Sequence, residues 1–246
     1  PRRMIADALR EVLGDRAVRV TISIPGGEEV ARRTFNPRLG VVGGLSVLGT
    51  TGVVRPMDEG ALLASMTMEL SVMRSLGVRR LVITFGGTGE KALRRAFGLE
   101  GRCVVQAGNY PGFVLDEAHR MGFERGLLGG HPGKLLKVAA GSFRTHNRDA
   151  DGRLEALCTQ AAIAGVPAET VRRLYECRTT ENAMDLLEEF GLKGLWTTLA
   201  AVAARRATDR SFGELPIEAA FVDNEGAILG ETSGAGTFRG LQGPAV

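Results

Sequence analysis

Two stretches of the sequence carry residues that could bind a ligand. In the first, an apolar strand predicted over Leu45–Leu48 runs into Gly49, Thr50, Thr51 and Gly52 before a long helix. Glycine permits positive φ and close approach of the backbone, and N–H groups at a helix N-terminus can hold an anionic or polar group. The turn is therefore a candidate cofactor site, although a tight strand-to-helix turn with capping threonines has the same spacing.

The second stretch, Gly130 to His146, is basic and rich in small residues. Its candidate ligand-binding side chains are His131, Lys134, Lys137, Arg144 and His146. Lys and Arg recognise carboxylates through charge-assisted hydrogen bonds, and Arg often does so bidentately. The cluster therefore favours an acidic ligand. The alternative is ordinary surface charge, which Asp149 and Asp151 would neutralise in a structural network.

Two polar residues follow other glycine-containing turns. Glu90 occupies a position at which an acid can accept the hydroxyls of a ribose, or can interact with a helix dipole without binding any ligand. Asn109 is a candidate contact to a cofactor or substrate. His131 and His146 lack the spacing of a protein metal site, so no bound metal is predicted.

The elements expected to position these residues alternate between strand and helix. Strands are predicted over residues 80–85, 103–107 and 126–129, and helices over 58–76, over 113–121 and from 131 onward. Short, continuous apolar strands separated by helices are typical of an α/β fold, with a mainly parallel sheet covered by helices on both faces, as in Rossmann-like domains. Ligands bind at the carboxyl ends of such strands. Four glycine-rich turns are expected there on one rim, at 49–52, 86–90, 108–112 and 130–133.

Three regions are predicted along the chain. Residues 1–35 would form an N-terminal helix and an edge strand, because the segment 17–24 alternates between apolar and polar residues. Residues 36–232 would form the α/β domain that binds cofactor and substrate, including a helical segment at 151–208 and a C-terminal β-hairpin. Residues 233–246 are expected to be a flexible tail.

Composition excludes several classes of protein. The net charge of +3 and pI near 9.0 favour an anionic ligand. Aromatic residues make up only 5% of the chain and do not interleave with a basic run, so a nucleic acid is not an expected partner. The sequence has neither an apolar run of membrane-spanning length nor a signal-peptide pattern, and a cytoplasmic protein without membrane contact is predicted. Three scattered cysteines indicate neither a disulfide framework nor a zinc site.

Long strings of the sequence resemble a known family. NPRLGVVGGLSVLGTTGVVRP (36–56), HPGKLLKVAAGSF (131–143) and the TH-x-x-DADGR pattern (145–153) are similar to the cobalt-precorrin-5B C1-methyltransferases of anaerobic cobalamin biosynthesis. The resemblance extends from the first residues to about Arg206. The additional N-terminal region of this family, with its Gly-Tyr-Thr-Thr-Gly type of motif, has no match here, so the resemblance is to the C-terminal major part.

The resemblance implies transfer of a methyl group from S-adenosylmethionine to C1 of cobalt-precorrin-5B, a tetrapyrrole, giving cobalt-precorrin-6A. It strengthens the assignment of Gly49–Gly52 to the cofactor, with Glu90 and Asn109 as the further candidates from their turns, and the acetate and propionate groups of the macrocycle fit the basic cluster of the second stretch. No acid–base residue is identified. Self-association into a homo-oligomer is compatible with the sequence.

Two other functions remain open. One is a fragment that binds a tetrapyrrole without catalysis. The other is a nucleotide-dependent oxidoreductase on the same fold, although the G-x-G-x-x-G fingerprint is missing.

Overall fold

The computed structural model describes residues 1–34, 36–41, 43–46, 58–149 and 151–245. The chain divides into two compact units, Pro1–Ser65 and Met66–Val246. Helix α3 (Glu59–Ser75) contains the boundary between these units. Its predicted ends are confirmed, because Asp58 Oδ1 accepts a hydrogen bond of 3.2 Å from the Ala61 N–H, and Gly77 follows the helix with a φ of 83°.

The first unit contains little regular structure besides its helices. These are α1 (Arg2–Leu13), α2 (Gly27–Arg32) and the 3₁₀ helix η1 (Asn36–Leu39). The predicted edge strand at 17–24 is wrong, since no strand forms there and Val18, Val20, Ile22 and Ile24 are exposed. A strand is stabilised by hydrogen bonds to a neighbouring strand, and the described residues provide no such neighbour for this segment.

The second unit is built on a five-stranded sheet. Its strands are β1 (Arg80–Thr84), β2 (Val104–Gln106), β3 (Arg125–Gly130), β4 (Ile217–Val222) and β5 (Ile228–Glu231). They lie in the order β2-β1-β3-β4-β5, and only the β4–β5 pair is antiparallel. The predictions of an α/β fold with a mainly parallel sheet and of a C-terminal hairpin are therefore confirmed.

Helices cover both faces of this sheet. On one face, α4 (Gly87–Phe97) packs against β2, β3 and β4 together with the 3₁₀ helix η2 (Ala235–Phe238). On the other face, α5 (Pro111–Arg120), α6 (Pro132–Ala139) and α10 (Leu195–Arg210) pack against one another and against the strands. Each crossover between parallel strands contains a helix, which is the connection that such a sheet requires.

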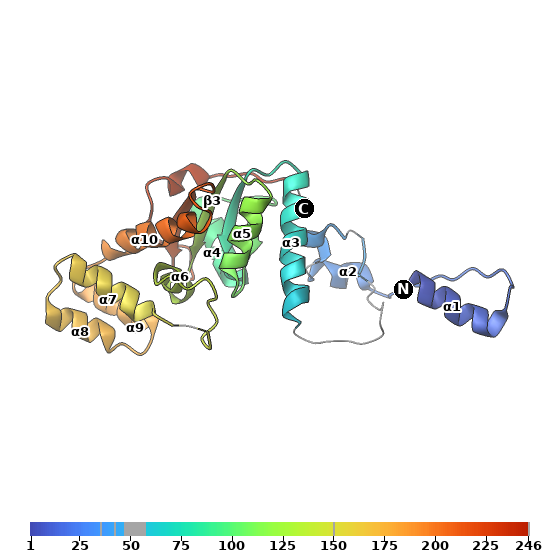
Figure 1. The fold of residues 1–246 in the computed structure, drawn as a ribbon, viewed down its shortest axis with the longest axis horizontal. Coiled ribbons are helices and arrows are strands. Elements are labelled where there is room, and N and C mark those ends of the chain that lie inside the picture. Colours follow the sequence, from blue (N-terminus) through green and yellow to red (C-terminus); the bar gives the residue numbers. More distant parts are fainter. Residues whose placement is uncertain (35, 42, 47–57, 150, 246) are drawn as a thin grey trace. The chain divides into compact units, whose positions relative to one another are not determined.

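The predicted helical segment is also confirmed. Helices α7 (Arg153–Ile163), α8 (Ala168–Tyr175) and α9 (Thr180–Glu189) gather beyond one end of the sheet, and α7 packs against α6 and α10 (Figure 1). The hydroxyl of Thr179 caps α9 by accepting a hydrogen bond of 3.1 Å from the Asn182 N–H. In the described part of the chain, no helix combines the length and apolar character needed to cross a membrane.

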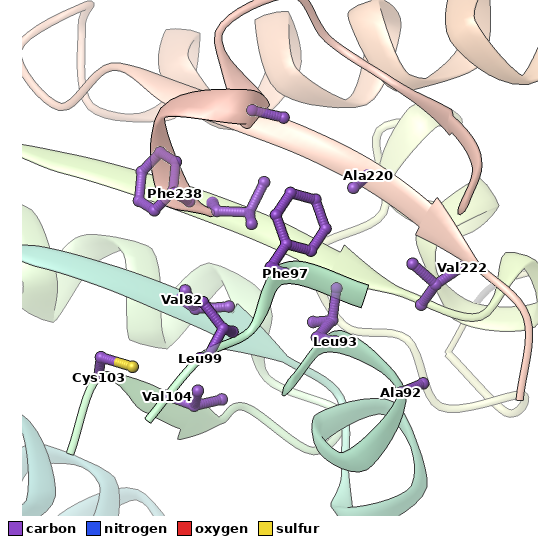
Figure 2. Close-up of a cluster of buried hydrophobic side chains, with 12 residues drawn as sticks. Val82, Ala92, Leu93, Phe97, Leu99, Cys103, Val104, Ala220, Val222 and Phe238 are labelled. Carbon is purple, nitrogen blue, oxygen red and sulfur yellow. The ribbon is translucent and has the colours of Figure 1, made fainter. Parts of the chain in front are cut away.

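The C-terminal segment closes the core on the α4 face. Figure 2 shows Phe238 in the cluster that contains Val82 of β1 and Phe97 of α4. Phe238 is fully buried, and the N–H of Gly240 donates a hydrogen bond of 2.7 Å to the Phe97 carbonyl. The sequence predicts a flexible tail at 233–246, but the structure differs, because burying one Phe side chain contributes about 1.5–3 kcal/mol and holds this segment in place.

Candidate functional site at the carboxyl edge of the sheet

The strand order of the sheet reverses direction at one position, next to β1. The chain passes from β1 to β2 on one side of β1 and then crosses to β3 on the other side. The direction in which strands are added therefore reverses between β1 and β3, and open α/β sheets bind ligands outside the carboxyl ends of the strands at such a switch point. We call the ends of β1, β2 and β3, with the turns that follow them, the carboxyl edge.

Three of the four predicted glycine-rich turns lie at the carboxyl edge. Two follow β1 at Gly86 and β2 at Gly108, and the third begins with Gly130, the last residue of β3. The prediction of a common rim is thus confirmed for these three turns. The fourth turn, Gly49, Thr50, Thr51 and Gly52, lies outside the described residues, and its assignment to the cofactor stays a prediction.

The turn between β1 and α4 leaves space for a ligand. The backbone of Gly86 is extended, and a Cβ atom added there would meet no other heavy atom of the described chain within 4 Å. No described side chain caps the N-terminus of α4. The first N–H groups of a helix lack intrahelical partners, so this turn presents hydrogen-bond donors at the carboxyl edge.

Glu90 lies in the first turn of α4 and is buried, with 6% of its surface exposed. Its Oε1 accepts a hydrogen bond of 2.8 Å from Arg94 Nε, and its Oε2 accepts one of 2.7 Å from Gln106 Nε2. These bonds tie α4 to the end of β2. A ligand hydroxyl would have to bind carboxylate oxygens that already accept hydrogen bonds from Arg94 and Gln106. Binding of the cofactor by Glu90 stays a prediction.

Lys134 connects two turns of the carboxyl edge. Its Nζ donates to Asn109 Oδ1 at 2.6 Å and to the Gly108 carbonyl at 3.3 Å, so a predicted substrate residue and a predicted cofactor residue are in direct contact. Burial lowers the pKa of the Lys134 ammonium, and the positive charge of Lys137 lowers it further. The side chain as a whole is only partly buried, in contrast to that of Lys137.

His131 caps the helix that follows β3. Its Nδ1 accepts a hydrogen bond of 3.2 Å from the Gly133 N–H, which leaves Nε2 as the donor nitrogen of the neutral ring. Nε2 lies 4.0 Å from Glu181 Oε1. His131 therefore stabilises the turn between β3 and α6 through its Nδ1. Its Nε2 takes no part in that hydrogen bond.

Lys137 is buried rather than available at the edge, with 1% of its surface exposed. Its Nζ donates to the Thr145 carbonyl at 3.2 Å and to Asn147 Oδ1 at 2.7 Å. Burial lowers the pKa of this ammonium as well. Lys137 therefore holds the segment after α6 in place through these two hydrogen bonds. The buried position of its ammonium does not support the predicted contact with substrate.

Arg144 and His146 lie on that fixed segment. Arg144 Nε is 3.4 Å from Asp149 Oδ2, and its guanidinium lies over the ring of Tyr110, 5.3 Å from the centroid. Nδ1 of His146 accepts a hydrogen bond of 3.2 Å from the Arg148 N–H. The neighbouring Thr145 N–H donates to the Asn109 carbonyl at 2.9 Å, which joins the segment to the carboxyl edge.

Gln106 and Asn147 complete this network, although neither is among the site residues predicted from the sequence. A detectable signal existed for Gln106, because it is an amide at the end of an otherwise apolar strand. No comparable signal marks Asn147, which lies in the loop that Lys137 holds through its hydrogen bonds to Thr145 and Asn147. Within the described ranges, no three His, Cys, Asp or Glu side chains gather in a way that could hold a metal ion.

Two family models match the chain. The model described as "CbiD" matches residues 1–56, and the model described as "CbiD, C-terminal domain" matches residues 144–233. The first match includes the turn at Gly49–Gly52, and the second includes Arg144 and His146. No solved structure matches the chain.

Curated relatives match most of the chain. A protein of Photorhabdus laumondii named cobalt-precorrin-5B C(1)-methyltransferase is 43% identical over 210 residues, which are 85% of this chain and 56% of the relative. Proteins of the same name from Tolumonas auensis and Citrobacter koseri are 43% and 41% identical, over 84% and 81% of this chain and 55% and 53% of their own lengths. The chain therefore spans slightly more than half the length of these relatives.

Proposed function

Because this chain belongs to the CbiD family, we propose that it forms part of a methyltransferase that methylates C1 of cobalt-precorrin-5B in anaerobic cobalamin biosynthesis. The product would be cobalt-precorrin-6A, and the methyl donor would be S-adenosylmethionine. The observation that carries the proposal is the carboxyl edge, where the open turn at Gly86 and the partly buried Lys134 lie near the switch point of the sheet. The names of the relatives supply the reaction.

The two ligands would use different parts of this edge. The donor would lie along glycine turns, as in Rossmann-like folds, where small residues let a nucleoside approach the backbone. The macrocycle would lie on the side of α6, with its carboxylates near Lys134 and Arg144. His131 and His146 add hydrogen-bonding groups on the same side. Asn109, which accepts from Lys134, lies where the two ligands would be neighbours.

The reaction asks little acid–base chemistry of the protein. An electron-rich C1 attacks the methyl carbon in line with the sulfur, the new C–C bond forms as the S–CH₃ bond breaks, and S-adenosylhomocysteine leaves with the electron pair. The sulfonium already activates the methyl group. The protein would contribute mainly by holding the two reactants in line and at attack distance, away from water.

A single-turnover experiment tests this function. Excess protein is mixed with cobalt-precorrin-5B and S-adenosylmethionine that carries a ¹³C-labelled methyl group, and the tetrapyrrole is analysed by NMR. The proposal predicts label at C1 and one S-adenosylhomocysteine released for each methyl transferred. Binding of the tetrapyrrole without transfer would instead indicate a binding fragment. In a parallel mixture with a reduced nicotinamide cofactor in place of the methyl donor, oxidation of that cofactor would indicate the oxidoreductase alternative.

The lowered pKa of Lys134 makes substrate binding depend on pH. Only the protonated ammonium attracts carboxylates, so affinity for cobalt-precorrin-5B should fall as the pH rises through the pKa of Lys134, which lies below the ordinary lysine value of 10.5. Lys134→Arg keeps its charge over this range and should move the loss of affinity to higher pH. Fluorescence titrations from pH 7 upward would measure both curves. Coinciding curves for the two proteins would contradict a direct role of Lys134.

A further inference from the structure

A buried hydroxyl without a partner lies at the switch point. Thr84 is the last residue of β1 and is fully buried, and its Oγ1 has no hydrogen-bond partner in the described parts of the chain. A Cβ atom added to Gly89 would lie 2.7 Å from this oxygen, and one added to Gly130 would lie 3.6 Å from it. The hydroxyl therefore lies between the first turn of α4 and the end of β3. Unpaired buried polar groups are rare because burial removes their bonds to water.

The first turn of α4 adds a second set of donors at the same place. The helix has eleven residues, and its N-terminus carries the positive end of the helix dipole together with N–H groups that no described side chain caps. Glycine at position 89 lets the first turn of α4 lie directly against Thr84 Oγ1, because any side chain there would collide with this oxygen. Donors from a helix N-terminus and a hydroxyl at its base suit a small anion.

The acid nearest to this turn does not supply that anion. Both carboxylate oxygens of Glu90 accept hydrogen bonds from Arg94 and Gln106, at 2.8 and 2.7 Å. Those bonds hold the carboxylate toward β2, whereas Thr84 faces β3 through Gly130. Among the described residues, the Glu90 carboxylate therefore does not pair with the Thr84 hydroxyl.

We propose that the turn between β1 and α4, with Thr84 at its base, binds the carboxylate of the amino-acid part of the methyl donor. This inference rests on the proposed function and adds to it the orientation of the donor. The N–H groups of Gly87, Thr88 and Gly89 and the Thr84 hydroxyl donate to the carboxylate. The carboxylates of the macrocycle bind on the other side of the switch point, near Lys134.

The inference is tested by calorimetric titration of the whole 246-residue chain with two probes. S-adenosylhomocysteine carries the amino-acid carboxylate, and 5′-methylthioadenosine lacks it. The substitution Thr84→Val keeps the shape of the side chain and removes its hydroxyl. We expect it to weaken S-adenosylhomocysteine binding about tenfold, as for the loss of one hydrogen bond to a charged group, and to change 5′-methylthioadenosine binding by less than about twofold.

Thr145→Val is the matched control. Thr145 is also buried, and its Oγ1 also lacks a partner among the described residues, but it lies on the segment after α6. The substitution changes only the side chain and keeps the bond from the Thr145 N–H to the Asn109 carbonyl, so it should leave the affinity for S-adenosylhomocysteine unchanged. The melting temperature of Thr84→Val should equal or exceed that of the unsubstituted protein, because the change removes an unpaired buried hydroxyl. A lower melting temperature would show that the hydroxyl has a structural partner and would contradict the proposal.

The remaining outcomes separate the inference from the function on which it rests. Suppose that S-adenosylhomocysteine binds the unsubstituted chain, and that Thr84→Val weakens the binding of both probes equally or of neither. The carboxylate then does not bind at this turn, and the inference is overturned while the proposed function stands. If S-adenosylhomocysteine does not bind the unsubstituted chain, the proposed function is contradicted, and the inference falls with it.

Discussion

Replacing Lys137 by glutamate should destabilise the folded protein by more than about 3 kcal/mol. The substitution places a carboxylate beside two acceptors, the Thr145 carbonyl and Asn147 Oδ1, in a site with almost no solvent exposure. An uncompensated buried charge typically costs about 3–5 kcal/mol. Urea denaturation followed by circular dichroism measures the change in the free energy of unfolding.

Lys137→Met is the matched control for this prediction. Methionine preserves most of the packing of the aliphatic stem but donates no hydrogen bond, so the two oxygens lose a donor and the expected cost is about 1–3 kcal/mol. If Lys137→Glu leaves the free energy of unfolding unchanged and instead abolishes tetrapyrrole binding, the ammonium is a substrate contact. The structural role assigned to it would then be wrong.

Replacing Lys134 by glutamate should have the largest effect on substrate affinity. The change removes a cation near the proposed carboxylates of the macrocycle and adds a like charge. Loss of one charge-assisted hydrogen bond costs about 1.5–3 kcal/mol, so we expect the dissociation constant for cobalt-precorrin-5B to rise at least tenfold. Affinity for S-adenosylhomocysteine should change by less than about threefold, since the proposed donor carboxylate lies on the other side of the switch point.

Lys193→Glu controls for the change in net charge. Lys193 is exposed and pairs with Glu188 after α9, outside the carboxyl edge, so its replacement should leave both affinities within about twofold. Equal losses of donor and substrate affinity in Lys134→Glu, with the fold intact, would contradict the separation of the two ligands. The contact between Lys134 and Asn109 would then be needed for the binding of both ligands.

The sequence predicted the sheet well because its strands are short and apolar and are separated by helices. Strands β1 and β3 and the hairpin lie where the apolar runs lie, and Asp58 and Gly77 delimit α3 as expected from cap chemistry. The strand predicted at 17–24 failed for the opposite reason. Alternation reveals which face of a strand would be apolar, but not whether a neighbouring strand is present to receive its hydrogen bonds.

The candidate site was predictable in place but not in detail. Glycine turns after consecutive strands identified the carboxyl edge, because parallel strands end on the same side of a sheet. Lys134 and Lys137 look equivalent in the sequence, yet Lys134 reaches the edge and Lys137 is buried, because Lys137 lies one turn further along α6, where its ammonium binds Thr145 and Asn147 of the segment after the helix. The role proposed for Thr84 could not be predicted, because its unpaired hydroxyl becomes apparent only when α4 is packed above β1.

The central claim is that the carboxyl edge binds the methyl donor. Hydrogen–deuterium exchange of the whole chain, with and without saturating S-adenosylhomocysteine, tests it most directly. The account predicts that peptides covering residues 84–92 and 107–113 gain protection, whereas peptides from α8 and from β5 do not. Protection confined to α7, α8 and α9, with unchanged exchange at residues 84–92, would contradict it.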